Sequence, residues 1–345
     1  MGQERVTGRL IERSYEVGTE AELHVNNVRG AVRVTGVESS TIRLTIEVDP
    51  EHNVADEDIE RLPIDLEQEG SRVNVKVLSD KAIMGWFERR SGPPVVRISI
   101  EAPLRTLANV SCVSADVSMA GLNAMQTANT VSGKVAVTDV TGDLRLNTVS
   151  GDALISRTNG AVRWNSVSGD LIVREGQTTA ITANSVSGNA EAVLDGHLSG
   201  GVQVQTVSGD LRLTVPATFG CEAQLSSMSG SVQCGLPAQV LEVKRGRWHA
   251  TVNGGGPVVR LSSMSCSLRL NSTGGQQAAS FRPGQSAGPG AAFAPQTATT
   301  GSGQQPADER LRILSQVERK EISIEEGLAR LDALRGQTTE MGGDR

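Results

Sequence analysis

The chain contains 345 residues with a formal net charge of −6 at pH 7, and only 2% of its residues are aromatic, whereas 38 are glycine. A globular core built by a chain of this length normally contains more Phe, Tyr and Trp, so the composition favours a thin interior of Val, Leu, Ile and Ala. The acidic balance argues against a general nucleic-acid-binding role, because phosphate binding needs a clustered basic surface.

The N-terminal region, residues 1–108, is predicted to be β-rich. Alternating apolar residues predict strands over 31–37, 41–48, 63–68, 72–78 and 95–102. The acidic segment 53–62 is typical of a helical turn or a loop. We expect the strands to form a β-layer that caps the repeats that follow, because an uncapped repeat end exposes unpaired strand edges.

Two adjacent aromatic residues, Trp86 and Phe87, lie in the segment 83–94, which interrupts the β pattern. One interpretation is a hairpin tip that presents aromatic and basic side chains to a partner or a membrane surface. The other is a loop that folds its aromatic rings over the edge of the repeats. On the first interpretation, Trp86 and Phe87 are candidate partner contacts.

Residues 109–271 contain a sequence repeat. Glycine recurs every nine residues, at Gly133, Gly142, Gly151, Gly160 and Gly169. Nine residues suit one short strand and one tight turn, in which glycine supplies a positive φ. Two such units close one eighteen-residue coil, and stacked coils pair their strands in parallel. The predicted fold class is therefore all-β, a parallel β-solenoid of two-strand coils.

A second pattern supports the eighteen-residue period. Val-Ser-Gly or a close variant begins at Val113, Val131, Val149, Val167, Val186, Val207, Met228 and Met264. We assign these valine and methionine positions to the interior, and the serines that follow them to the turn, where a hydroxyl can bond the adjacent backbone. The long last step indicates either two coils or one coil with an excursion.

That excursion falls in the segment 240–256, where Arg245 and Trp248 lie among other basic residues. A bulged coil with a solvated basic loop is one interpretation. A contact site for an anionic partner, with Arg245 and Trp248 as its candidate residues, is the other.

The remaining polar and sulfur-containing residues of the repeats favour structural roles. The four cysteines lack a Cys-x-x-Cys spacing and are expected to be reduced small residues. Aspartates follow several turn glycines, but the Gly-Gly-x-Gly-x-Asp pattern of calcium-binding β-rolls is missing, so we interpret them as solvated turn carboxylates. We expect no cofactor and no metal.

The C-terminal part changes character twice. Residues 272–306 are rich in Gly, Ser, Gln, Ala and Pro, which predicts a disordered, flexible linker. Residues 307–336 show helical periodicity with a capping box at 323–326, which predicts a small helical hairpin. So small a unit is expected to need a protein partner or a second copy of itself. Its candidate contacts are the apolar residues Leu311, Leu314, Leu328 and Leu331.

The sequence contains no run of eighteen apolar residues, and its first twenty residues contain several charges without an apolar segment. These features predict neither a transmembrane span nor a secretory signal, and they favour a cytoplasmic location.

The Val-Ser-Gly-Asp-Leu coils, with the segments 23–36 and 98–103, resemble the bacterial putative-adhesin β-strand-repeat family, a family of unknown function. The segments 309–314 and 322–331 resemble the small helical module of envelope-stress proteins of the LiaX and YvlB type. These resemblances imply a bacterial protein of envelope-stress or surface biology.

No catalytic motif accompanies the repeats. The histidines lack a catalytic spacing, and neither a nucleophile elbow nor a phosphate-binding loop occurs. We therefore expect a non-enzymatic binding or scaffold protein whose helical tail recruits a partner or self-associates. The alternative is a structural protein that polymerises end to end, as bactofilin-like solenoids do.

Overall fold

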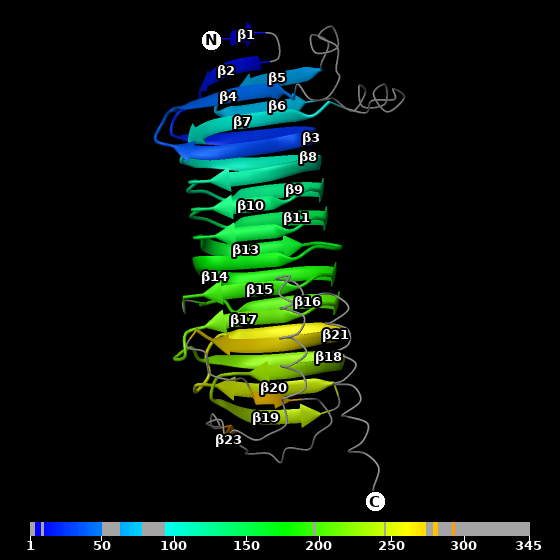
Figure 1. Ribbon diagram of the computed structural model, residues 1–345. Helices are drawn as coiled ribbons and strands as arrows, with labels where there is room; N and C mark the ends of the chain where they lie inside the picture. Colours follow the sequence, from blue (N-terminus) through cyan, green and yellow to red (C-terminus); the bar gives the residue numbers. More distant parts are fainter. Residues whose placement is uncertain are drawn as a thin grey trace, which may run out of the picture. The chain divides into compact units, whose positions relative to one another are not determined.

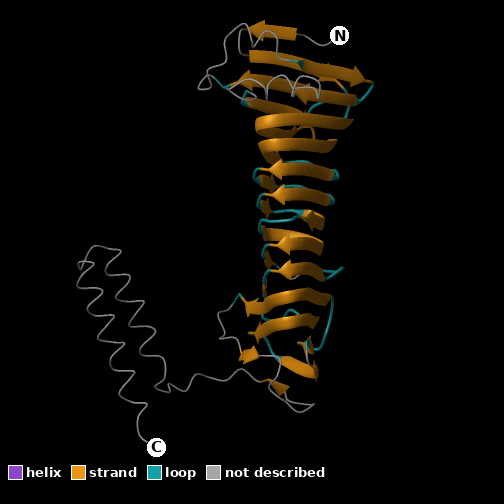
Figure 2. Ribbon diagram, turned by 90° about the vertical axis from the view of Figure 1, so that its right-hand side faces the viewer, coloured by secondary structure: helices purple, strands orange, loops and turns teal. Residues whose placement is uncertain are grey.

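The structure is a computed structural model that describes residues 4–7, 10–49, 63–77, 94–195, 198–244, 246–273, 279–281 and 292–293. All helical or strand structure in these ranges is β-strand, which confirms the predicted all-β class (Figure 2). The strands belong to one unit, residues 1–295. No helix in the described ranges has the length and apolarity that a membrane crossing requires.

The centre of this unit is a stack of short strands in two columns (Figure 1). The first column contains β9 (Gln126–Ser132), β11 (Leu144–Ser150), β13 (Asn159–Asn165), the second half of β14 (Leu171–Ser187) and β16 (Val202–Ser208). The second contains the end of β8 (Arg105–Ala120), β10 (Val135–Thr138), β12 (Ala153–Ser156), the start of β14, β15 (Ala190–Leu194) and β17 (Leu211–Val215).

Neighbouring strands in each column pair in parallel. Paired residues are 18 apart in the coils up to β13, and the separation rises to 19 or 21 residues at β15, β16 and β17. Leu144 lies opposite Val162, and Val135 lies opposite Ala153. We call the residues between two such paired positions one coil. Because the register equals the sequence period, each residue of a coil lies above the equivalent residue of the next coil.

The interior lies between the two columns and is filled by alternate residues of each strand. In β11, Leu144 and Leu146 are buried while Arg145 is exposed. Trp164 is among the largest fully buried side chains, and it pairs with Leu146 on one side and Ala183 on the other. The small alanine leaves volume for the indole, which explains how so thin an interior accommodates a tryptophan.

The first coil comes from the N-terminal region. β3 (Glu20–Val37) pairs in parallel with β8, so that Leu23 lies opposite Ala108, 85 residues further along the chain. The repeats therefore begin before the predicted boundary at residue 108. The sequence period did not reveal this, because the chain leaves the stack after β3 and returns only at β8.

The strands between β3 and β8, together with the two that precede β3, cover the N-terminal end of the stack. β6 (Arg72–Val77) and β7 (Val96–Pro103) pair in parallel with β3. The layer then continues antiparallel through β4 (Thr41–Val48), β2 (Leu10–Glu16) and β1 (Glu4–Thr7) beside β7, and through β5 (Ile64–Glu69) beside β6. This is the β-layer that the sequence predicts for the region.

The last coils are not stacked in sequence order. β21 (Val258–Ser272) pairs in parallel with β16 and β17, and its other edge pairs in parallel with β18 (Cys221–Cys234). The coil formed by β21 is thus inserted between two coils that precede it in the sequence. We call it the inserted coil.

Antiparallel strands cover the far side of β18. β20 (Arg247–Val252) pairs with its first half and β22 (Ala279–Phe281) with its end, and β19 (Ala238–Lys244) lies between β20 and β23 (Ala292–Phe293). The long last step in the sequence is therefore one coil with an excursion, the β19–β20 hairpin. β22 and β23 lie within 272–306, the range predicted to be a linker. Short segments of that composition can still pair with an open strand edge.

Candidate binding surface at the coil corners

The Val-Ser-Gly triplets form the corner at which the chain passes from the first strand column to the second. The valines here are 45–50% exposed, Met264 is 56% exposed and Met228 is 83% exposed. The assignment of these positions to the interior is therefore wrong. In stack order, with the inserted coil in its place, they form one file that we call the corner ridge: Val113, Val131, Val149, Val167, Val186, Val207, Met264 and Met228.

The residue before each valine explains why the valine points outward. Strand alternation in β11 places Thr148 inside, 6% exposed, so Val149 must face solvent, and Ser150 is exposed as well because the chain turns there. At the equivalent corner positions the hydroxyls of Thr130 and Thr206 donate to the carbonyl oxygens two residues later, at 3.2 and 3.0 Å. The inward hydroxyl thus satisfies the turn's own backbone, a contact that valine cannot make.

Glycine is required at the corner for a second reason besides its backbone angle. Gly133 and Gly169 both have φ of +136°. A Cβ atom at Gly169 would collide with the carbonyl oxygen of Gly151 in the preceding coil, and one at Gly133 with that of Ala115. Successive coils therefore approach each other through bare backbone at this point.

The residues that follow the corner glycines also serve the fold. The Oδ1 atom of Asp152 accepts the backbone N–H of Asp170 at 3.0 Å, and Oδ1 of Asp170 accepts that of Asn189 at 2.8 Å. The prediction of merely solvated turn carboxylates is therefore corrected, since each bridges to the next coil. Within the described ranges, no cluster of three His, Cys, Asp or Glu residues is suited to hold a metal ion.

An open groove of about 670 Å³ lies at the methionine end of the corner ridge. Its lining includes Asp210, Met228, Cys266 and the small residues Ser231 and Ser267. Ser231 and Ser267 occupy the position that Asp152, Asp170 and Asp210 hold in other coils, and their side chains are smaller. Oδ1 of Asp210 accepts the Ser267 N–H at 2.7 Å, so this carboxylate also bridges two coils.

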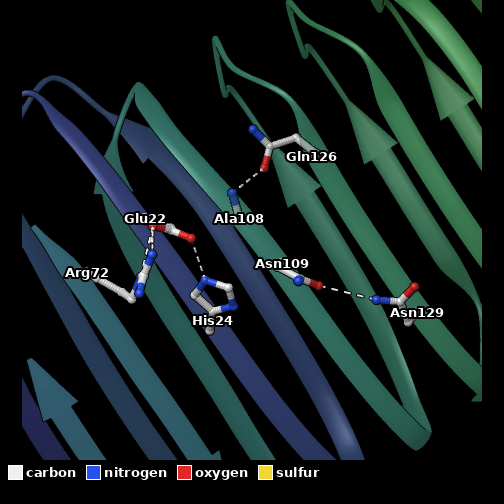
Figure 3. Close-up of polar contacts among 7 residues, drawn as sticks. All are labelled: Glu22, His24, Arg72, Ala108, Asn109, Gln126 and Asn129. Atoms are coloured by element: carbon white, nitrogen blue, oxygen red, sulfur yellow. Dashed lines mark hydrogen bonds and ion pairs between the residues drawn. The ribbon is translucent and has the colours of Figure 1, made fainter. Parts of the chain in front are cut away.

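A ladder of asparagine side chains runs beside the corner ridge on the first column. The Nδ2 atom of Asn147 donates to Asn129, Asn165 donates to Asn147 and Asn184 donates to Asn165, at 2.8–2.9 Å, and Asn129 continues to Asn109 at 3.2 Å (Figure 3). The ladder was not predicted from the sequence, although its asparagines recur at 18 to 20 residues, close to the coil period. Its members bond one another, which identifies the ladder as a stacking device.

Charged side chains stabilise other positions in the stack. In β3, the hydrogen bond from His24 and then that from Arg72 hold the pKa of the Glu22 carboxyl below its ordinary value (Figure 3). Asp139 and Arg157 directly follow the second-column strands β10 and β12. Arg157 donates to both carboxylate oxygens of Asp139, which lowers the pKa of Asp139. Asp139 and Arg157 both have positive φ, so the ion pair between them holds an otherwise unfavourable backbone conformation.

The residues proposed from the sequence as partner contacts are not part of the corner ridge. The Trp248 side chain is 3% exposed and inward-facing with Ala250 and Val252 of β20, so it is a core residue and not a surface contact. Its neighbour Arg245 lies outside the described residues, as do Trp86, Phe87, Leu311, Leu314, Leu328 and Leu331. Those seven remain predictions.

The four cysteines are free thiols, as expected. Burial raises the pKa of Cys112 and of Cys221 to about 12, and it also raises the pKa of Cys234 and Cys266. A thiol with a raised pKa forms little of the reactive thiolate near neutral pH.

Stacked parallel coils, with polar groups committed to coil contacts and one apolar file exposed, define a β-repeat protein with an elongated candidate binding surface. Residues 21–270 match the family model described as Toastrack DUF4097, and the chain belongs to that family.

Two solved bacterial structures are similar to this chain over most of their length. A putative adhesin from Bacteroides fragilis NCTC 9343 is 13% identical over 77% of this chain and 98% of its own, with a TM-score of 0.47. A putative lipid binding protein from Parabacteroides distasonis ATCC 8503 is 13% identical over 76% and 97%, with a TM-score of 0.39. Among curated proteins, none matches the chain.

Proposed function

We propose that this chain is a non-enzymatic binding scaffold, a parallel β-solenoid whose corner ridge binds a partner. The observation that carries the proposal is the ridge itself: eight apolar side chains, 45–83% exposed, in one file on consecutive coils. Single exposed apolar residues need no explanation, but a contiguous apolar patch on a protein surface is typical of an interaction site.

The chemistry of the described residues supports binding over catalysis. The cysteine thiols are disfavoured as nucleophiles by their raised pKa values. The corner hydroxyls and post-glycine carboxylates hold the backbone of their own or the next coil. Groups committed to stacking in this way are poorly placed to act on a substrate.

The binding proposal is tested by a photo-crosslinking amino acid placed at Val149 in cells that produce the protein. Leu154 is the matched control, since it is 44% exposed against 46% for Val149 and lies in the second strand column of the same coil. We expect crosslinked protein from position 149 and not from position 154. Equal yields at the two positions, or none at either, would remove the basis for the proposal.

The helical hairpin predicted over 307–336 adds a second proposed interaction. Its apolar residues Leu311, Leu314, Leu328 and Leu331 are proposed to bind a protein partner or a second copy, in the setting of bacterial envelope stress. A cytoplasmic location stays a prediction. Deleting residues 307–345 is expected to lower the assembly state measured by light scattering, whereas an unchanged mass and unchanged partner recovery would refute a role for the tail.

The alternative of end-to-end polymerisation has less support. Parallel addition of another copy needs an open parallel strand at each end of the stack. β3 is covered by β6 and β7, and β18 is covered by the antiparallel strands β20 and β22. Strands that cover the ends in this way are a common protection against edge-to-edge association.

A further inference from the structure

All eight side chains of the corner ridge are apolar, but they differ in shape. β-branched valine suits an extended backbone at a strand end, so strand propensity alone could explain the six valines. It does not explain Met264 and Met228, which lack a branched Cβ and are the most exposed members of the ridge. Because apolarity persists where strand propensity does not, contact with another apolar surface is the better explanation.

The spacing of the ridge restricts what that surface can be. Paired strands are about 4.8 Å apart, so successive ridge residues repeat at roughly that distance. A partner helix repeats every 5.4 Å and would drift by roughly 4 Å over seven steps, while an extended strand presents one face every ~6.7 Å. A second stack of paired strands has the same repeat, so all of its ridge residues can stay in contact.

Symmetry restricts the orientation. If two ridges ran side by side in the same direction about a two-fold axis, each residue would face its own copy, and side chains would meet tip to tip. A two-fold axis perpendicular to the stack reverses one ridge and permits an offset of half a coil, so that side chains of one copy fit between those of the other. Only this second arrangement both closes the dimer and interleaves the ridges.

We propose that the corner ridge binds the corner ridge of a second copy of this chain, antiparallel, with the Val113 end of one copy against the Met228 end of the other. This inference rests on the proposed binding function and names the partner. Flexible methionines at one end suit it, since they can adapt to the shape of the opposing valines.

The size of the ridge sets the expected strength of the dimer. Seven steps of about 4.8 Å and a width of roughly 10 Å give on the order of 340 Å² per copy, below the ~800 Å² of a standard interface. We therefore expect a reversible dimer whose population depends on protein concentration.

The first test compares full-length variants by sedimentation over a wide concentration range. Replacing Val131, Val149, Val167 and Val186 by Thr keeps the branched Cβ and exchanges one of the two methyl groups for a hydroxyl, so the fold should be retained and the thermal midpoint little changed. We expect the wild-type mass to rise with concentration and this variant to stay lower by up to twofold at the top of the range. Leu154→Thr, outside the ridge, should behave as wild type.

The second test maps the orientation with a short bismaleimide crosslinker. The crosslinking variants carry Cys234→Ser and Cys266→Ser, because Cys234 is only partly buried and Cys266 lines the groove beside Met228. Cys112 and Cys221 are buried thiols with raised pKa values, so they give a low background. A mixture of V113C and M228C chains is expected to crosslink, whereas each variant alone is not. Crosslinking of V113C to itself would overturn the antiparallel arrangement. A wild-type mass that does not change with concentration, or a Thr variant that associates as wild type does, would overturn the proposal that the partner is a second copy. In that case, photo-crosslinks from Val149 to another protein would still support the proposed binding function.

Discussion

Replacing Trp164 by Ala is expected to lower the free energy of unfolding by about 3–5 kcal/mol. The indole is 1% exposed and lies in a thin interior, where the neighbouring coils contribute Leu146 and Ala183 at the paired positions. Because adjacent coils are held apart by their own backbone pairing, they cannot collapse into the space that the indole leaves. Urea unfolding followed by circular dichroism measures the loss.

Trp164→Phe is the matched control for this prediction. The indole Nε1 is buried and has no hydrogen-bond partner among the described residues, so phenylalanine removes an unsatisfied donor while it keeps most of the apolar volume. We expect a loss of less than about 1.5 kcal/mol. If Ala and Phe destabilised equally, packing of the ring would not be the cause.

Replacing Gly169 by Ala is expected to cost more than the unfavourable backbone angle alone. A non-glycine residue in the left-handed helical region costs about 1–2 kcal/mol, and Gly169, with φ of +136°, lies outside that region, where side chains are less tolerated still. At Gly169 the added Cβ would also collide with the carbonyl oxygen of Gly151, which belongs to a paired coil and cannot move without breaking the register. We expect a total loss above about 3 kcal/mol, measured as a lower thermal midpoint or as failure to fold.

Gly70→Ala measures a conformational cost without a collision. Gly70 also has positive φ, +62°, but no atom of the described residues lies within 4 Å of the position of an added Cβ. The variant should therefore show only the conformational cost of about 1–2 kcal/mol. A loss at Gly169 no larger than this would mean that coils do not depend on bare backbone contact at the corner.

The corner ridge illustrates where reasoning from residue type fails. Sequence analysis placed Val149 inside because valine is apolar, and left Thr148 unassigned. In the structure Thr148 is inside and Val149 outside. Alternation counted from Leu144 and Leu146 would have given this answer, because it continues to the last residue before the turn.

Trp248, the asparagine ladder and the groove beside Met228 differ in how far the sequence could have predicted them. Trp248 was chosen for its basic neighbours, but alternation along β20 buries it with Ala250 and Val252. The asparagine ladder could have been found from the sequence, because its members recur at 18 to 20 residues, close to the coil period. The groove beside Met228 could not, because it depends on the inserted coil bringing Cys266 and Ser267 beside Asp210.

The sequence by itself determined the composition of a coil: two strands, glycine corners and alternating buried residues. It also determined the register of the coils that follow one another in the sequence, because a local period places like residues opposite one another. Only the tertiary structure decided which coils are neighbours. β3 joins β8 across 85 residues, and the inserted coil lies between β16 and β18. Coils with the same period offer interchangeable strand edges, so the order of stacking follows from the connections and caps at each end and not from the repeat.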